Sequence, residues 1–412
     1  RHCCARWLRL GTMDAKTAAA STNIEFKGSM MKDIVILEGA RTPMAEWVGG
    51  RAGNGQKGGA LSQISAVELG AIATREALKR SALSAEAVDH LILGNAIQTG
   101  VNPIYAARHV ALDSGCSIET PAMIVNRLCG SGIQALISGA QMITLDEASV
   151  VAATGTENLS QAPFVIRGAR EGLRLGGGTM DDMLLAALTD ERCGCPMAKT
   201  SDNLARKYGI SREDQDAFAA RSHKAGARAT ADGTLNQEIT PVEIPGRKGT
   251  TTVINADDHF VADTSVEKLA GLRPPFGEDS MVTAGNASGI VDGAASLILA
   301  SEEVAATQDR KPLGRIVAWN VAAVEPEIMG IGPAPAIRGA LKRAGIGLDE
   351  IDLFEINEAF AGQYLAVEKE LELDRERVNV NGGAIALGHP LGATGTRLVL
   401  TLLYELRRSG RR

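Results

Sequence analysis

The feature that most constrains the fold is an internal repeat at an offset of 263 residues, as between Ala77 and Ala340. Several short blocks match in this single register, and chance would give one such match rather than several. The matching pairs, earlier segment first, are Ala77–Arg80 with Ala340–Arg343, Val88–Asp89 with Ile351–Asp352, Ala96 with Ala359, and Leu128–Gly132 with Leu391–Gly395. A period this long excludes a solenoid. The repeat therefore predicts two similar domains packed face to face.

Each half of the chain has the rhythm of an α/β protein. Apolar runs with strand character alternate with segments of helical periodicity, a pattern that predicts an α/β sheet. In the first half the expected strands are 34–37, 90–93, 121–125 and 149–153, and the expected helices are 66–79 and 133–143. A second series of the same kind runs from Gly314 to the end of the sequence.

The repeat and the region between its copies give a division into domains. We predict a non-core extension over 1–30, an N-terminal domain over 31–160 that is completed by 292–311, an inserted loop domain over 161–291, and a C-terminal domain over 312–412. A helix from Ser211 to Ala229 is expected within the insert, because Ser211 and Asp214 form a variant of the capping box. In the 263-residue register the copy of strand 149–153 would begin at residue 412, so the C-terminal domain is expected to lack its last strand.

Composition excludes several classes of function. A formal charge of -6 argues against general attraction to nucleic acid, so any anionic ligand must be held by local groups. No apolar run is long enough to cross a bilayer, which predicts a soluble protein. The six cysteines lack regular spacing, so neither a disulfide framework nor a metal site is expected. We expect a cytoplasmic protein, with the mitochondrial matrix left open by the arginines that precede Asp14.

Cys129 is the best candidate nucleophile in the chain. It lies in N-R-L-C-G-S-G, where strand 121–125 gives way to a helix that begins near Ser131. The positive end of a helix and its free backbone N–H groups favour the thiolate, and the glycines permit close approach of a ligand. For an arbitrary cysteine a buried structural role would be the better interpretation, but this context reverses that preference.

His389 is the best candidate for the base that activates Cys129. It lies in N-G-G-A-I-A-L-G-H-P-L-G, and 263 residues before it is Asn126, three positions from Cys129. A pseudo-twofold axis between the domains would bring the two equivalent loops to one site. Asn357, at the end of the expected strand 352–356, could hold a water or a carbonyl oxygen that Glu358 orients.

At this point the motifs resemble those of the thiolases. N-R-L-C-G-S-G, G-N-A-S-G (residues 285–289), N-E-A-F (357–360) and N-G-G-A-I-A-L-G-H-P-L-G (381–392) occur in the family's order, and the similarity runs from about Met31 to the end. Within the family the chain looks closest to 3-ketoacyl-CoA thiolases (acetyl-CoA acyltransferases), with acetoacetyl-CoA thiolases as near relatives. The resemblance implies a five-layer αβαβα fold with an inserted loop domain, and a homodimer or homotetramer.

The resemblance also implies roles for individual residues. Cys129 would carry the acyl group, His389 would be its base, and Asn357 would hold a water that forms an oxyanion hole with His389. Residues that match the lining of the pantetheine and acyl tunnel are Met197, Phe276, Ser288, Ala359 and Phe360. The implied reaction is thiolysis of 3-ketoacyl-CoA in fatty acid β-oxidation, or the reverse condensation. Coenzyme A would be a co-substrate, with no permanently bound cofactor and no metal.

Two departures from the family pattern leave alternatives open. Thiolases continue into a last strand with a C-x-G motif, which this sequence does not contain, so turnover could be impaired. Val261 stands where the family often has an arginine for the CoA nucleotide, and Arg228 is a candidate replacement. The alternatives are an acetoacetyl-CoA thiolase or a non-catalytic CoA-binding subunit. A condensing synthase acting on carrier-bound chains is disfavoured, because only His389 lies in a suitable motif.

Overall fold

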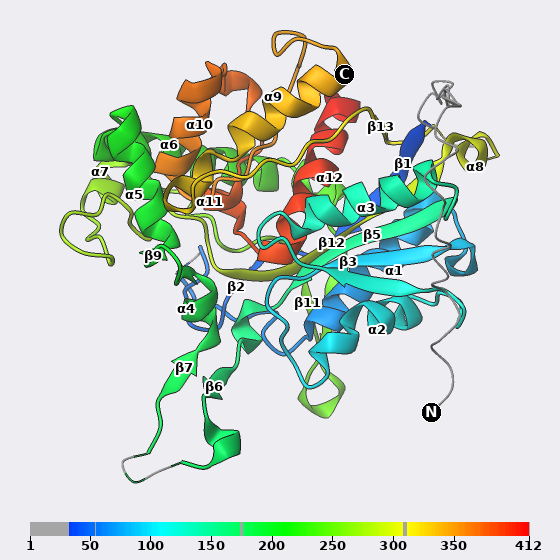
Figure 1. Cartoon of the computed structure of the whole chain (residues 1–412), viewed down its shortest axis with the longest axis horizontal. Helices are drawn as coiled ribbons and strands as arrows, with labels where there is room; N and C mark the ends of the chain where they lie inside the picture. The colour runs from blue at the N-terminus through cyan, green and yellow to red at the C-terminus, as the bar shows by residue number, and fades with distance from the viewer. Residues whose placement is uncertain (1–32, 54, 174, 176, 308–310, 412) are drawn as a thin grey trace, which may run out of the picture. The chain divides into compact units, whose positions relative to one another are not determined.

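A computed structural model describes residues 33–53, 55–173, 175, 177–307 and 311–411. The predicted extension over 1–30 lies outside these residues. The largest feature is a seven-stranded sheet with the strand order β13-β1-β12-β5-β3-β4, in which β2 also pairs with β12 (Figure 1). Its strands are β1 (Ile34–Arg41), β2 (Ala45–Glu46), β3 (His90–Gly94), β4 (Ala122–Val125), β5 (Val150–Glu157), β12 (Val291–Ser301) and β13 (Gly314–Ile316).

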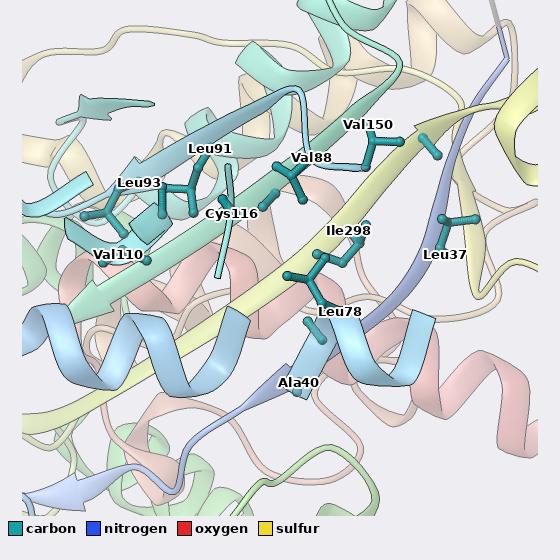
Figure 2. Packing of buried hydrophobic residues seen from close by; sticks show 14 of the residues in the cluster. Leu37, Ala40, Leu78, Val88, Leu91, Leu93, Val110, Cys116, Val150 and Ile298 are labelled. Carbon is teal, nitrogen blue, oxygen red and sulfur yellow. The ribbon is translucent and has the colours of Figure 1, made fainter. Parts of the chain in front are cut away.

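Helices cover both faces of this sheet. Alternate residues of β1 point to opposite faces, as the pleat requires: Val35 and Leu37 face α1 (Ala66–Ser81) and α2 (Ala106–Asp113). Ile34 and Ile36 face α3 (Ser131–Thr144) and α12 (Leu391–Ser409). Figure 2 shows the first of these cores, with Leu78, Val110, Leu91 and Ile298 among its side chains. The strands and helices expected in the first half all form, with ends shifted by a few residues.

The segment between the two halves of the repeat carries small hairpins and helices, and the helices of the second half follow it in the chain. Its elements are β6 (Phe164–Ile166), β7 (Met180–Asp182), α4 (Met183–Ala187), β8 (Thr189–Asp190), β9 (Cys195–Pro196), α5 (Met197–Tyr208), α6 (Arg212–Ala231), β10 (Val242–Pro245), β11 (Thr251–Ile254) and α7 (Val266–Ala270), followed by α8 (Glu302–Ala306). The capping box predicted for α6 is present, since Ser211 and Asp214 bond to each other's backbone N–H. The second repeat adds α9 (Pro333–Ala344), α10 (Ala361–Leu371) and α11 (Ala384–Leu387).

The repeat is visible in matched helices and caps. Helix α9 carries the copy of the A-L-K-R segment of α1, and both helices end in a left-handed residue at the equivalent position, Ala82 with φ 58° and Gly345 with φ 71°. Helices α3 and α12 begin at the copies of the L-C-G-S-G segment. The duplication therefore determines local backbone geometry as well as sequence.

The second half differs in its strands. The strand expected over 352–356 makes a single parallel bridge, Phe354 with Val378, among the described residues. Asn379, with φ 47°, ends this pairing, because its side chain bonds the backbone N–H and C=O of Ile356. The first strand of the copy, β13, pairs with β1 of the first half instead. The second sheet of the five-layer arrangement is thus reduced, in the described residues, to these contacts.

Candidate active site

The two equivalent loops are brought together by a close crossing of α3 and α12. A Cβ placed on Gly132 would lie 2.5 Å from the backbone N of Thr396, and one on Gly395 would lie 2.3 Å from the backbone N of Ile133. Gly132 and Gly395 are equivalent in the repeat, and so are Ile133 and Thr396. The contact is therefore reciprocal, as a pseudo-twofold axis requires. It holds the start of the helix after Cys129 against the start of the helix after His389.

The loop that carries Cys129 is a tight, partly exposed turn. Leu128, the residue before the cysteine, has φ 49°, a left-handed conformation that is costly for a branched residue. The turn is held because Asn126 Nδ2 donates to Ala96 O (2.9 Å) and Leu128 N donates to Asn126 Oδ1 (2.9 Å). Cys129 itself is half-buried and packs in an apolar cluster with Ile97 and Leu391.

The thiol of Cys129 is not predisposed to ionise in the free protein. Its pKa is raised to about 11, chiefly by burial; a backbone hydrogen bond opposes the rise, and the nearby carboxyl of Glu157 adds a smaller upward effect. The backbone N–H group at this helix start does lower the thiol pKa, as expected, but burial outweighs that effect. Two of the N–H groups at this helix start, those of Gly130 and Ser131, are used within the turn by Arg127 O and Leu128 O.

His389 is held in one tautomer by its neighbours. Its Nδ1 lies 2.6 Å from Thr394 Oγ1, and that hydroxyl lies 3.1 Å from Pro390 O. The hydroxyl has one proton, which it donates to the carbonyl, so Nδ1–H donates to the hydroxyl. Nε2 then carries the lone pair and accepts from Asn357 Nδ2 at 3.3 Å. The proton-accepting nitrogen is therefore the one beside Asn357.

The imidazole of His389 is neutral at ordinary pH. It is 6% exposed, and burial lowers its pKa to about 3, with a smaller contribution from the positive charge of Arg397. No hydrogen bond joins Cys129 to His389 in the part of the chain that the structure describes. A neutral thiol and a neutral imidazole thus lie on the two loops of the crossing.

Asn357 and Glu358 have different roles although they are adjacent. Asn357 faces His389, and its Oδ1 is buried without a protein partner. Glu358 is fully buried, and its carboxylate accepts from Ser222 Oγ (2.7 Å), Asn379 Nδ2 (2.8 Å) and Ile385 N (3.2 Å). Glu358 therefore ties together the loops around His389, and its suggested role in orienting a water stays a prediction.

Sequence reasoning missed Glu157, the last residue of β5. One carboxylate oxygen accepts from Asn95 Nδ2 (3.0 Å) and Ile97 N (2.9 Å), and the other from Ala96 N (3.0 Å) and Gly392 N (2.8 Å). Since Ala96 O also holds Asn126, this buried carboxylate links the cysteine loop to the first turn of α12. Burial raises its pKa to about 7. Its position at the carboxyl end of a central strand was the available signal.

A cavity of about 740 Å³ opens beside these residues. Five of the predicted site residues line it: Met197, Phe276, Ser288, Phe360 and His389. Ala359 is not among the lining residues, but its carbonyl accepts from Ser288 N (3.0 Å) and so positions the wall. Cys129 and Asn357 are not among the lining residues, but the cysteine packs in an apolar cluster whose members Leu159, Leu184 and Leu391 do line the cavity.

The structure places Val261 and Arg228, the two positions considered for binding the CoA nucleotide, at different cavities. Val261 lines the cavity, as its place in the sequence suggested. Arg228 does not: it lines a different, polar cavity, and its guanidinium donates to Val380 O (2.6 Å). The hypothesis that Arg228 replaces the family's arginine is therefore not supported by its position.

Among the described residues no group of His, Cys, Asp or Glu side chains is arranged to hold a metal ion. No helix within the same residues is long and apolar enough to span a membrane.

Comparisons with known proteins show what the chain as a whole is similar to. The chain matches the family model of the thiolase N-terminal domain over residues 34–303 and that of the thiolase C-terminal domain over 310–412. It is 45% identical over 383 residues to the mitochondrial 3-ketoacyl-CoA thiolase of Homo sapiens, covering 93% of this chain and 94% of the relative. It is 46% identical over 379 residues to an acetyl-CoA acetyltransferase of Pseudomonas aeruginosa, covering 91% and 93%. The crystal structure of the human mitochondrial thiolase in complex with CoA superposes with a TM-score of 0.87 at 44% identity, covering 93% of each chain.

Proposed function

The chain belongs to the thiolase family, and on that premise we propose that it is an acyltransferase that cleaves 3-ketoacyl-CoA with coenzyme A to give acetyl-CoA and a shortened acyl-CoA. The same site would run the reverse condensation. The observation that carries the proposal is His389 at the wall of the cavity, with Nε2 free to accept a proton beside Asn357, on the loop equivalent to that of Cys129.

In the proposed reaction His389 Nε2 takes the proton of the Cys129 thiol, and the thiolate adds to the 3-keto carbon of the substrate. The bond between C2 and C3 then breaks, and its electron pair leaves on acetyl-CoA as an enolate that takes up one proton. The acyl group on Cys129 passes to the thiol of a second CoA, which frees the cysteine.

Both catalytic groups are neutral in the free protein, and this suits the order of events. With the thiol pKa near 11 and the imidazole pKa near 3, the ion pair is disfavoured until substrate binds. A substrate oxygen bonded by Asn357 and the imidazole would stabilise the developing negative charge. We infer that ionisation of Cys129 is coupled to substrate binding, which protects the thiol from side reactions.

The proposal is tested by supplying acetoacetyl-CoA and CoA and measuring acetyl-CoA by chromatography. In parallel, intact-mass measurement after incubation with acetyl-CoA should show one acetyl group on Cys129. Acetylation without turnover would indicate that Cys129 is a competent nucleophile and that the later transfer to CoA fails. Absence of both, in a chain that is folded, would contradict the proposal.

A second candidate is the same chemistry restricted to the four-carbon substrate, favoured by the 46% identity to a protein named acetyl-CoA acetyltransferase. The apolar cavity of about 740 Å³ favours longer acyl chains as well. Comparing kcat/KM for acetoacetyl-CoA with that for a 3-ketoacyl-CoA of eight or more carbons separates the two candidates.

We further propose that the protein is a homodimer or homotetramer. Apolar side chains are exposed on the arm formed by β6, β7 and α4: Phe164, Ile166, Leu173, Met180 and Leu185 are each 48–64% exposed. Strand β4, which bonds to β3 on one side, is an edge of the main sheet and is only partly buried. Light scattering of the chain and of Met180→Asp would test whether this arm mediates association.

We also propose a cellular compartment for the protein. Several relatives with 44–45% identity, including the human one, are named mitochondrial. We therefore favour the mitochondrial matrix over the cytoplasm, and imaging of a C-terminally tagged chain would decide between them.

A further inference from the structure

The walls of the main cavity carry very little charge. Of its described lining residues, only Arg51 and Lys268 are permanent cations, and only Glu46 is an acid. Glu46 is occupied, since its carboxylate bonds His259 Nδ1. The remaining wall is mostly apolar, with Leu159, Leu184, Leu188, Leu269, Leu272 and Phe276 among its members. Arg51 and Lys268 are therefore the permanent cations that the described wall offers to an anion in this cavity.

Lys268 lies on the short helix α7 and is held over the cavity by a weak local pair. Its ammonium donates to Asp263 O (2.9 Å) and forms an ion pair with the Asp263 carboxylate. The two side chains are 58% and 78% exposed, so the pair contributes little to stability and exchanges readily with another anion. Lys268 therefore lies at the cavity and can exchange its ion pair with Asp263 for one with a bound anion.

The chemistry of CoA determines what these cations would bind, and this inference rests on the proposed function. CoA has a long, nearly uncharged arm that ends in the thiol, and a nucleotide that carries a pyrophosphate and a 3′-phosphate. The arm fits the apolar walls, while a protein of formal charge -6 offers the phosphates no general attraction. A local cation at the cavity is needed.

Neither of the two positions that the sequence suggested can provide it. Val261 lines the cavity but has no charge. Arg228 lies at the other cavity and bonds backbone carbonyl oxygen there. We propose that Lys268, assisted by Arg51, binds the phosphates of the CoA nucleotide and so determines the preference of this chain for CoA over shorter thiols.

The test measures the CoA affinity of Lys268→Gln by calorimetry and its kcat/KM with CoA and with pantetheine as the acceptor thiol. We expect the Kd for CoA to rise about 5- to 10-fold, as loss of one charge-assisted contact predicts. The kcat/KM for pantetheine, which lacks phosphates, should change less than about twofold. The effect should shrink as salt is added, because the contact is exposed.

Three further variants make the test specific. Lys79→Gln is the matched control, because Lys79 is also an exposed lysine paired with a carboxylate, that of Glu76, but lies away from the cavity. Lys268→Arg should restore CoA affinity to within about twofold, since it keeps the charge. Arg51→Gln should weaken CoA binding less than Lys268→Gln does. Dephospho-CoA reveals whether the 3′-phosphate or the pyrophosphate is bound.

The outcomes separate this inference from the proposed function. If the unaltered chain carries out thiolysis and Lys268→Gln binds CoA as tightly as Lys79→Gln, the inference is overturned and the function stands. An equal loss with CoA and with pantetheine also overturns it, since that would indicate a structural role. If the unaltered chain binds CoA through Lys268 but shows no thiolysis, the inference stands and the proposed function fails.

Discussion

The loop of Cys129 and the loop of His389 occupy equivalent positions in the repeat but have opposite environments. Residues Asn126, Arg127 and Leu128 are exposed, whereas every residue from Gly382 to Arg397 is buried. The first loop is a strained turn before α3, and the second is locked by Thr394, Gly289 and the buried Glu358 network. The difference teaches that duplication determines where two groups meet, while local packing determines what chemistry each can perform.

The largest effect is expected at the exposed loop. Cys129→Ser should lose the acyl adduct and lower kcat by about 10⁴-fold or more, because the covalent route is removed. Cys193→Ser is the matched control, a free and partly buried cysteine outside the cavity. Intact mass and turnover are the measurements. Equal acylation of the two variants would mean that another residue is the nucleophile.

The buried loop is tested by His389→Gln, which should lower the rate of Cys129 acylation by about 10² to 10⁴, the usual contribution of a general base. Thr394→Val keeps the imidazole but removes the partner of Nδ1. Its effect should be smaller and should alter the pH profile, because the tautomer is no longer fixed. Stopped-flow acylation rates against pH would show this, and an unchanged profile would contradict the assigned tautomer.

Asn357→Ala examines the amide that bonds His389 Nε2. Loss of one oxyanion donor predicts a fall in kcat of about 10² to 10³ with a small change in KM. Asn379→Ala is a useful contrast, because Asn379 bonds backbone atoms of the same segment and should lower stability instead. A KM effect without a kcat effect in Asn357→Ala would indicate a role in ground-state binding only.

Glu157 links the loops and should make their connection depend on pH. Its pKa is raised from 4.5 to about 7, so between these values the folded state keeps a proton that the unfolded state has released. The free energy of unfolding therefore falls as pH rises from 4.5 to 7, by up to about 3 kcal/mol, and is level above pH 7. Glu157→Gln should reduce that slope in denaturant titrations at several pH values. An identical slope in both proteins would show that Glu157 titrates normally.

The smallest effect is expected at the helix crossing itself. Gly395→Ala places a Cβ 2.3 Å from the backbone N of Ile133, so α3 and α12 must separate slightly. We expect a loss of about 2 kcal/mol in unfolding free energy, typical of overpacking. Gly271→Ala is the control, since its nearest neighbour, Lys268 O, would be at an ordinary 3.5 Å. Similar melting temperatures for the two variants would count against a tight crossing.

Much of the fold could be predicted because its signals are local. Strands β1, β3, β4 and β5 and helices α1, α3 and α6 follow from apolar periodicity and from caps such as Ser211. The irregular conformation of segment 352–356 could not be predicted from the sequence. A strand forms only where a neighbouring backbone bonds to it, and here the side chain of Asn379 bonds the backbone of Ile356 instead. The protonation state of Cys129 was also out of reach, since it depends on burial by Ile97 and Leu391.

The sequence by itself determined the duplication, and with it the equivalence of the Cys129 and His389 loops, because a register of matching residues needs no coordinates to be recognised. Only the tertiary structure decided that Glu157 joins these loops, that both catalytic groups are neutral, and that Lys268 rather than Arg228 lies at the cavity. The physical reason is that burial, desolvation and charge proximity belong to atoms that meet from distant parts of the chain.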